Sequence, residues 1–234
     1  VEDSTSRTQA TVVLPGGRTF RDFVLVNHDD VGLRAGGRPV CPAGAGEGDA
    51  HAGEPVSIAT KGCKGLDDSQ DAGLYGFNFR AEPMWFRLGH PPGEDFALTR
   101  DLDYARALSN GLMGGDPRTP IFTARAGQEV RFRLVQPGGH TRTGAFTLHG
   151  HAFAERPYTA GTVASQRIEG LRSQAGYRKG QWLATREGVG PGNHFDVVVE
   201  QAGGPFRISG DYLFRNMFPL AFDGGQWGIL RVTP

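Results

Sequence analysis

The sequence predicts an all-β fold, a sandwich of β-sheets with Greek-key connections. Short strand-like segments follow one another through the chain and are joined by turns. Glycine is plentiful, with 36 of 234 residues, and there are 15 prolines. This composition favours many turns and argues against a helical bundle. The length is ordinary for a single sandwich, so one domain is expected.

The first half of the chain carries few strand patterns. Residues 1–17 are predicted to be an N-terminal extension, and 19–27 has strand composition with partial alternation. Residues 35–73 are rich in glycine, alanine, proline and acids, which predicts a long loop insertion within the domain. A structured block starts at 75–80 and is expected to continue as an aromatic strand over 82–88.

One short helix is predicted, over residues 101–112. Apolar residues recur there at helical spacing, and Asp101 or Asp103 suits the N-terminus. The second half is a succession of strands. The segments with strand patterning are 128–135, 146–153, 162–168, 181–185, 194–201, 205–214 and 227–232.

The charge balance excludes two classes of partner. Lysine and arginine number 25, aspartate and glutamate also number 25, and the formal net charge is zero. No basic field is therefore available to attract nucleic acid or an anionic membrane surface. No apolar run approaches the ~20 residues that span a bilayer. The chain begins at Val1 without a leader, so a secreted protein would already have lost it.

The two cysteines, Cys41 and Cys63, lie in the predicted insertion. The simplest interpretation is one disulfide that closes a loop in an oxidising compartment, worth about 3 kcal/mol in the chain-entropy model. A metal site that includes His51 is an alternative, although the spacing fits no zinc-ribbon pattern. A third interpretation is that both cysteines are free thiols.

His149 and His151 are the main candidates for metal ligands. They lie within the strand pattern 146–153, and residues two apart on a strand share a face, about 7 Å apart. Imidazole suits copper and zinc. Hydrogen bonds to neighbours would explain the pair equally well. His140 lies in a turn, where it is either a third ligand or an exposed polar residue.

Several segments together resemble a cupredoxin domain of the multicopper oxidases. The resemblance covers most of residues 18–234, is weakest over 35–73, and implies a cupredoxin-like Greek-key β-sandwich for 18–234. The segments that carry it are 119–135, Leu148–Phe153, Pro191–Glu200 with its Pro-Gly and Asp-Val, and Gly210–Phe214. Residues 75–87 and 222–228 look like the large multi-domain branch that includes manganese oxidases, at its C-terminal domain.

The copper motifs of that family are degenerate here. In the family motif His-Pro-x-His-Leu-His-Gly-His, Gly144 and Thr147 take the first two histidine positions, while His149 takes a trinuclear-cluster position. Phe214-Arg215-Asn216 replaces His-Cys-His. A type 1 copper site needs a cysteine thiolate and imidazoles, so none of this kind is expected in the chain. An apolar plug is expected in its place, formed by Phe214, Met217, Phe218 and Phe222, with Arg215 turned to solvent or to an acid.

Two functions follow from the resemblance. It implies a component of a secreted or periplasmic multicopper oxidase, which oxidises a substrate such as a metal ion and reduces dioxygen to water. His149 and His151 would then contribute to a copper site shared with other cupredoxin domains or chains of the same oxidase. The alternative is a non-catalytic cupredoxin-like module that packs against or recruits partners, which the lost ligands favour.

Overall fold

The computed structural model describes most of the chain outside two long segments. The described residues are 2–3, 6–28, 34–35, 38–39, 75–89, 102–138, 143–154 and 182–234. Most of the predicted insertion, with Cys41 and Cys63, lies outside them, as does His140, so the predictions for these residues stay predictions. Within the described part, no helix is long and apolar enough to cross a membrane.

The first sheet is built around two parallel neighbours, β3 (Thr19–His28) and β8 (Val130–Val135). Antiparallel strands flank this pair, and part of the predicted N-terminal extension is one of them. These flanking strands are β1 (Glu2–Asp3), β2 (Ser6–Val13), β6 (Gly76–Phe77) and β13 (His194–Val199). Apolar and polar residues alternate from Val130 to Leu134 of β8, and the apolar side chains Val130, Phe132 and Leu134 are buried.

The second sheet has the order β12-β9-β14-β15-β7, in which only β15 and β7 are parallel. Its strands are β7 (Ile121–Arg125), β9 (Gly144–Leu148), β12 (Thr185–Val189), β14 (Gly210–Asn216) and β15 (Trp227–Thr233). Two small ribbons complete the described strands. They pair β4 (Arg34–Ala35) with β5 (Arg38–Pro39), and β10 (Phe153–Ala154) with β11 (Trp182–Leu183).

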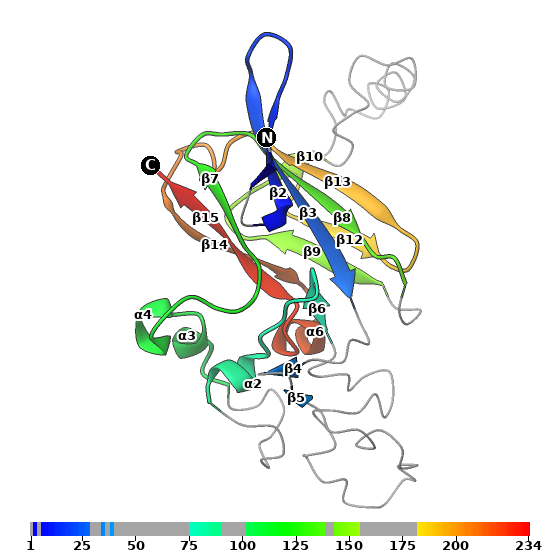
Figure 1. The fold of residues 1–234 in the computed structure, drawn as a ribbon, viewed down its shortest axis with the longest axis vertical. Coiled ribbons are helices and arrows are strands. Elements are labelled where there is room, and N and C mark those ends of the chain that lie inside the picture. The colour runs from blue at the N-terminus through cyan, green and yellow to red at the C-terminus, as the bar shows by residue number, and fades with distance from the viewer. Residues whose placement is uncertain are drawn as a thin grey trace, which may run out of the picture.

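The chain crosses repeatedly between the two sheets. It leaves β8 of the first sheet for β9 of the second, returns from β12 to β13, and crosses again to β14. Strands far apart in sequence therefore become neighbours, as Greek-key connections require. Figure 1 shows the two sheets face to face, with the helices gathered at one end. The prediction of an all-β sandwich with Greek-key connections is confirmed.

Phenylalanine rings fill the space between the sheets. Phe23 of β3 stacks on Phe122 of β7, with ring centroids 4.6 Å apart, and Phe214 of β14 stacks on Phe122 at 5.5 Å. Phe132 of β8 meets Phe214 edge-on at 5.7 Å. Such aromatic pairs add about 0.5–1.5 kcal/mol each beyond the area they bury. This core fixes which way the side chains of β14 point, so Arg215, next to Phe214, turns to the outer face of the second sheet.

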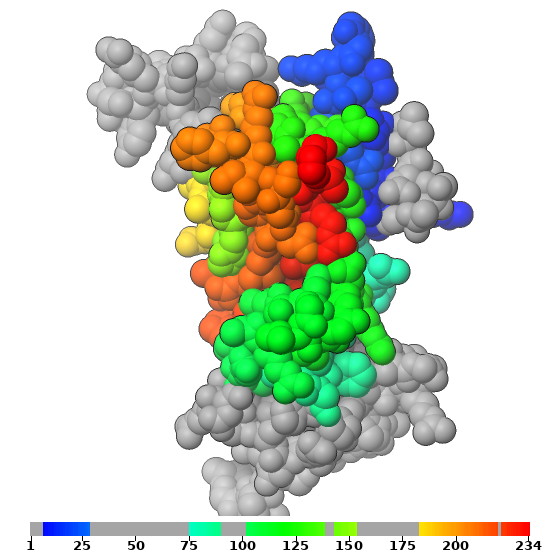
Figure 2. All heavy atoms as spheres, turned by 90° about the vertical axis from the view of Figure 1, so that its left-hand side faces the viewer, coloured from blue at the N-terminus to red at the C-terminus, as the bar shows by residue number. Residues whose placement is uncertain are grey.

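Short helices cover part of this outer face, by which we mean the face turned away from the first sheet. They are α2 (Met84–Arg87), α3 (Tyr104–Ala107), α4 (Asn110–Met113) and α6 (Pro219–Asp223). A second apolar cluster lies between helices and sheet, and includes Met84, Ala107, Phe222, Trp227 and Ile229. In Figure 2, the green segment that carries α3 and α4 lies over the lower part of this face.

Two predictions about the helices are corrected. Residues 82–88 do not form a strand, because Pro83 ends the extended segment and Met84–Arg87 is helical. The single helix predicted over 101–112 is two helices, since Ser109 is extended and its side chain accepts a hydrogen bond from the Leu112 N–H at 3.4 Å. Asp103 caps the first of them, by accepting from the Arg106 N–H at 3.0 Å.

Candidate functional site

The predicted metal pair lies on a turn rather than on a strand. β9 ends at Leu148, and Gly150 has φ of 73°, in the left-handed region that favours glycine. A Cβ at this position would also meet the ring of Tyr212 at 3.0 Å. The turn at Gly150 therefore ends the strand-like alternation of side chains between two faces. The prediction that His149 and His151 share one strand face is wrong, because one is exposed and the other buried.

His151 is part of the packing beneath the turn. Its ring is buried and meets the Tyr212 ring edge-on, with centroids 4.6 Å apart. Nε2 accepts the Gly203 N–H at 2.9 Å, so the proton of the neutral ring is on Nδ1, which donates to the His149 carbonyl at 3.0 Å. Burial lowers the pKa of His151 and keeps the ring neutral. Both nitrogens are therefore engaged in structural hydrogen bonds.

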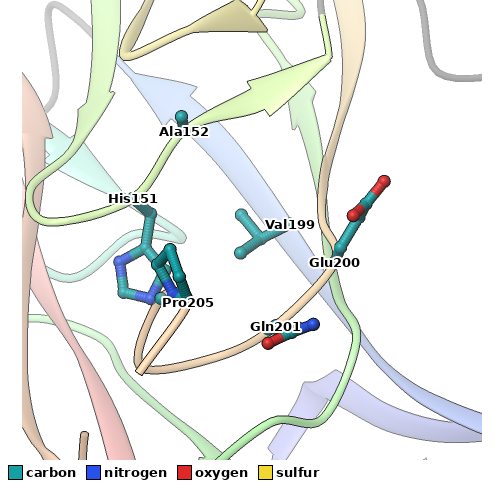
Figure 3. A pocket seen from close by; sticks show the side chains of 7 residues that line it. His151, Ala152, Val199, Glu200, Gln201 and Pro205 are labelled. Carbon is teal, nitrogen blue, oxygen red and sulfur yellow. The ribbon is translucent and has the colours of Figure 1, made fainter. Parts of the chain in front are cut away.

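A pocket of about 350 Å³ opens beside His151. It lies between the turn that follows β9 and the loop that follows β13, as Figure 3 shows. Its lining residues are His151, Ala152, Val199, Glu200, Gln201, Gly204 and Pro205. The loop is tightly bonded, with the Ile208 N–H donating to the Gly203 carbonyl at 3.0 Å. Glu200 is the charged residue of this lining, and His151 presents a ring whose nitrogens are already bonded.

His149 has a different partner. The Nε–H of Arg215 donates to its Nε2 at 3.1 Å, so the imidazole is a neutral acceptor. Burial and then the positive charge of Arg215 lower the pKa of His149 below the ordinary value of 6.5. A metal ion at Nε2 would have to displace this guanidinium, which carries the same sign of charge.

Arg215 lies between His149 and a buried acid. Its guanidinium stacks over the ring of Phe222, with Cζ 4.5 Å from the centroid. Partial burial lowers its pKa, while the charges of Asp223 and Tyr104 act in the opposite direction. The expectation that Arg215 would face solvent or an acid is therefore met only in part, since its one hydrogen bond within the described residues goes to a histidine.

Asp223 is almost completely buried, with 2% of its surface exposed. Its Oδ1 accepts the Tyr104 hydroxyl at 2.7 Å, while Oδ2 has no hydrogen-bond partner among the described residues. Burial raises the pKa of Asp223, and burial with this hydrogen bond raises the pKa of Tyr104. Tyr104 and Asp223 are 119 residues apart, so no spacing in the sequence pointed to this pair.

The predicted apolar plug is only partly correct. Phe214 is fully buried in the sandwich core, but Met217 and Phe218 are 39% and 41% exposed. Phe222 belongs to the second cluster, on the outer face. The chain therefore does not replace the family's ligands by one apolar filling, and polar side chains take up part of the space.

A buried amide network occupies the sandwich end next to Arg215. It consists of Asn27, Gln136, Asn216 and Gln226, which are all at most 6% exposed. Gln226 donates to the side chain of Asn27 and to the His28 carbonyl, and it accepts from Asn216 at 2.6 Å. Asn27 donates to Gln136 at 2.8 Å. Sequence reasoning missed this network, because Asn27 and Gln136 are 109 residues apart and Asn27 and Gln226 are 199 apart.

The side chain of Asn216 occupies the space directly beside Gly144. A Cβ at Gly144 would lie 2.5 Å from Nδ2 of Asn216, which is far inside contact distance. Asn216 cannot easily yield, since its Oδ1 accepts the Ala145 and Phe218 N–H groups at 3.2 and 3.0 Å. Two positions where the resemblance expects histidine ligands are thus filled by a glycine and the amide that takes its side-chain space.

The described residues contain no group of three or more histidine, cysteine, aspartate or glutamate side chains placed to hold a metal ion. The metal roles predicted for His149 and His151 stay predictions, and so does that of His140, which lies outside the described part.

Comparisons with known proteins give a likeness of fold. No protein-family profile and no curated protein matches the sequence. Among solved structures, the chain is similar to the McoA multicopper oxidase of Aquifex aeolicus, at 14% identity and a TM-score of 0.38, over 68% of this chain and 26% of that one. For a multicopper oxidase from Campylobacter jejuni the identity is 12% and the TM-score 0.35, over 70% of this chain and 24% of that one. For auracyanin B the identity is 18% and the TM-score 0.30, over 49% of this chain and 77% of that one.

The chain spans about a quarter of the length of these two oxidases. A likeness at such identities concerns the fold alone, so the function has to be argued from the residues of this chain.

Proposed function

We propose that this chain is a cupredoxin-type structural and partner-binding domain that retains no copper by itself, with no type 1 site, and that it serves within a larger, extracytoplasmic assembly of the multicopper-oxidase type. One observation carries the proposal. Each side chain of Phe214-Arg215-Asn216 contacts other side chains of the protein. Phe214 packs in the aromatic core, Arg215 donates a hydrogen bond to a histidine, and Asn216 belongs to the amide network. No thiolate or imidazole is offered at these positions.

The physical reason is the chemistry of the donor set. Blue copper sites require a cysteine thiolate with two imidazoles. Arg215 is a cation, and it occupies the lone pair of His149 that a metal would use. Buried polar groups are costly unless they are hydrogen-bonded, and Asn216 meets that demand through three partners at once. These contacts satisfy the Asn216 side chain without a metal ion.

A second candidate is the shared copper site of a multicopper oxidase, with dioxygen as the electron acceptor and a metal ion such as manganese as the substrate. It is favoured by the exposure of His149, whose Nδ1 makes no hydrogen bond within the described residues. Another domain or chain could supply the remaining ligands there.

Copper retention separates the two candidates. The purified 234-residue chain would be incubated with Cu(II), dialysed, and analysed for bound metal and visible absorption. We expect far less than one copper per chain and no intense thiolate-to-copper band. His149→Ala should behave like the wild type, and so should the control His194→Ala, which removes an exposed histidine at the start of β13.

Stoichiometric copper in the wild type and in His194→Ala, but not in His149→Ala, would reject the copper-free proposal in favour of a shared site. Copper retained equally by all three proteins would reject it as well, because it would reveal a metal site away from His149.

A further inference from the structure

We propose that Arg215, held in place by His149 and Phe222, is a binding site for a carboxylate side chain of a protein partner. The inference rests on the proposed function, since it names the chemistry by which the domain would recognise a neighbouring domain or chain. It depends on how Arg215 differs from four other buried or half-buried arginines, Arg87, Arg131, Arg133 and Arg231.

Each of these four arginines has a carboxylate partner of its own. Arg133 bonds Asp22 and Asp196 at 2.9 and 2.8 Å, and Arg231 bonds Asp116 and Asp211 at 2.7 and 2.8 Å. The pairs Arg87–Glu82 and Arg131–Glu129 have contacts of 3.0 and 2.6 Å. Within the described residues Arg215 has no such ion pair, although it is also withdrawn from full solvation.

The orientation of Arg215 leaves a defined part of the guanidinium unused. Nε is bonded to His149, and the ring of Phe222 lies against one face of the group. The two terminal nitrogens have no hydrogen bond within the described part of the chain. A planar guanidinium with both terminal N–H groups available matches a carboxylate in the bidentate geometry, which is the strong and orientation-specific form of this pair.

Asp223 does not fill this role. Its Oδ1 is held by Tyr104 at 2.7 Å, and the carboxylate is buried beneath the surface. Its field reaches Arg215, because it opposes the lowering of the arginine pKa by burial. No hydrogen bond joins the two residues in the described structure, however, since Arg215 is bonded to His149 instead. An incoming carboxylate would therefore find the terminal nitrogens of Arg215 unshared.

The surroundings indicate what kind of residue carries that carboxylate. Met217 and Phe218 follow Asn216, the last residue of β14, and are 39% and 41% exposed. Exposed apolar side chains next to one unpaired charge suit a contact in which an acidic residue is flanked by apolar ones. We therefore infer a glutamate or aspartate with an apolar neighbour as the recognised feature.

The test uses two short peptides and nuclear magnetic resonance of the full chain. Acetyl-Leu-Glu-Leu-amide carries the carboxylate, and acetyl-Leu-Gln-Leu-amide is the neutral match. We expect the first peptide to shift the signals of the Arg215 Nε–H and the His149 ring in a saturable way, and the second to leave them unchanged. Arg215→Gln should weaken binding of the first peptide by about 10-fold or more, because it removes a charge-assisted hydrogen bond.

Arg118→Gln is the matched control. Arg118 is exposed and, like Arg215, lies over a phenylalanine, with Cζ 5.6 Å from the Phe86 ring, and it should be replaceable without loss of binding. Equal shifts with both peptides, equal binding by Arg215→Gln, or no binding at all would each overturn the inference. The copper measurement tests the metal at His149 while the peptide measurement tests the terminal nitrogens of Arg215, so the two proposals can fail separately.

Discussion

Arg87 and Arg215 both stack on aromatic rings at the outer face of the second sheet, but their hydrogen bonds differ greatly. Arg87 lies over Trp227 at 5.8 Å and bonds Glu82, Asn110 and the carbonyls of Ala107 and Gly115, at distances of 2.5–3.1 Å. Arg215 lies over Phe222 at 4.5 Å and has one hydrogen bond among the described residues, to His149. One guanidinium is saturated by its own chain, and the other is not.

This difference separates a structural arginine from one available to a partner. Arg87 joins α2, α3 and the segment after α4, so its hydrogen bonds hold the helices together against the sheet. Its partner Glu82 also accepts the Arg118 N–H at 3.0 Å, which leaves both charges of the pair satisfied. If either residue of such a buried ion pair is removed, the charge of the other stays buried without a counter-charge, which strongly destabilises the fold. In the part of the chain that the structure describes, Arg215 has no comparable set of contacts.

The largest expected effect is therefore on stability at Arg87. Arg87→Met should lower the free energy of unfolding by about 3–5 kcal/mol, because Glu82 would remain buried without its cation. Arg215→Met should lower it by about 1 kcal/mol, since one half-exposed hydrogen bond is lost. Urea unfolding of both variants measures the difference. Equal losses would contradict the distinction between the two arginines.

A second variant tests whether the amide network beside Arg215, like the contacts of Arg87, loses stability when one of its residues is disturbed. Gly144→Ala should destabilise the chain by about 1–3 kcal/mol, because the new methyl group overlaps an Asn216 side chain that its hydrogen bonds hold in place. Gly115→Ala is a suitable control, since a Cβ there would meet no atom within 4 Å. Equal stability of the two variants, in the same urea assay, would show that the network can yield.

The smallest effect is a pH dependence at Asp223. Burial raises its pKa above the ordinary value of 3.8, so the folded chain holds this proton where the unfolded chain has released it. Its contribution to stability is therefore present below about pH 4 and is lost as the pH rises through the folded-state pKa. Asp223→Asn lacks this loss, so the variant should gain stability relative to the wild type between pH 4 and pH 8. Parallel profiles from urea unfolding at both pH values would rule out the effect.

The strands could be predicted well from the sequence, while the site could not. Alternation located β3, β8, β13 and β15 to within a few residues, because one face of each of these strands packs on the core. The same reasoning failed at His149 and His151, since a single positive φ at Gly150 ended the alternation between them. It failed again over 82–88, where an aromatic run suggested a strand and tertiary packing produced a helix.

The sequence by itself determined the all-β class, through local alternation and frequent turns, and it determined that Phe214-Arg215-Asn216 offers no thiolate for copper. Only the tertiary structure decided what these residues do instead. Arg215 meets His149 across 66 positions of the chain, and Asn27 meets Gln226 across 199. Periodicity reports which face of a strand is buried, because that depends on neighbouring residues. It carries no information on which distant side chains then share that space, and in this protein those distant pairs make the candidate site.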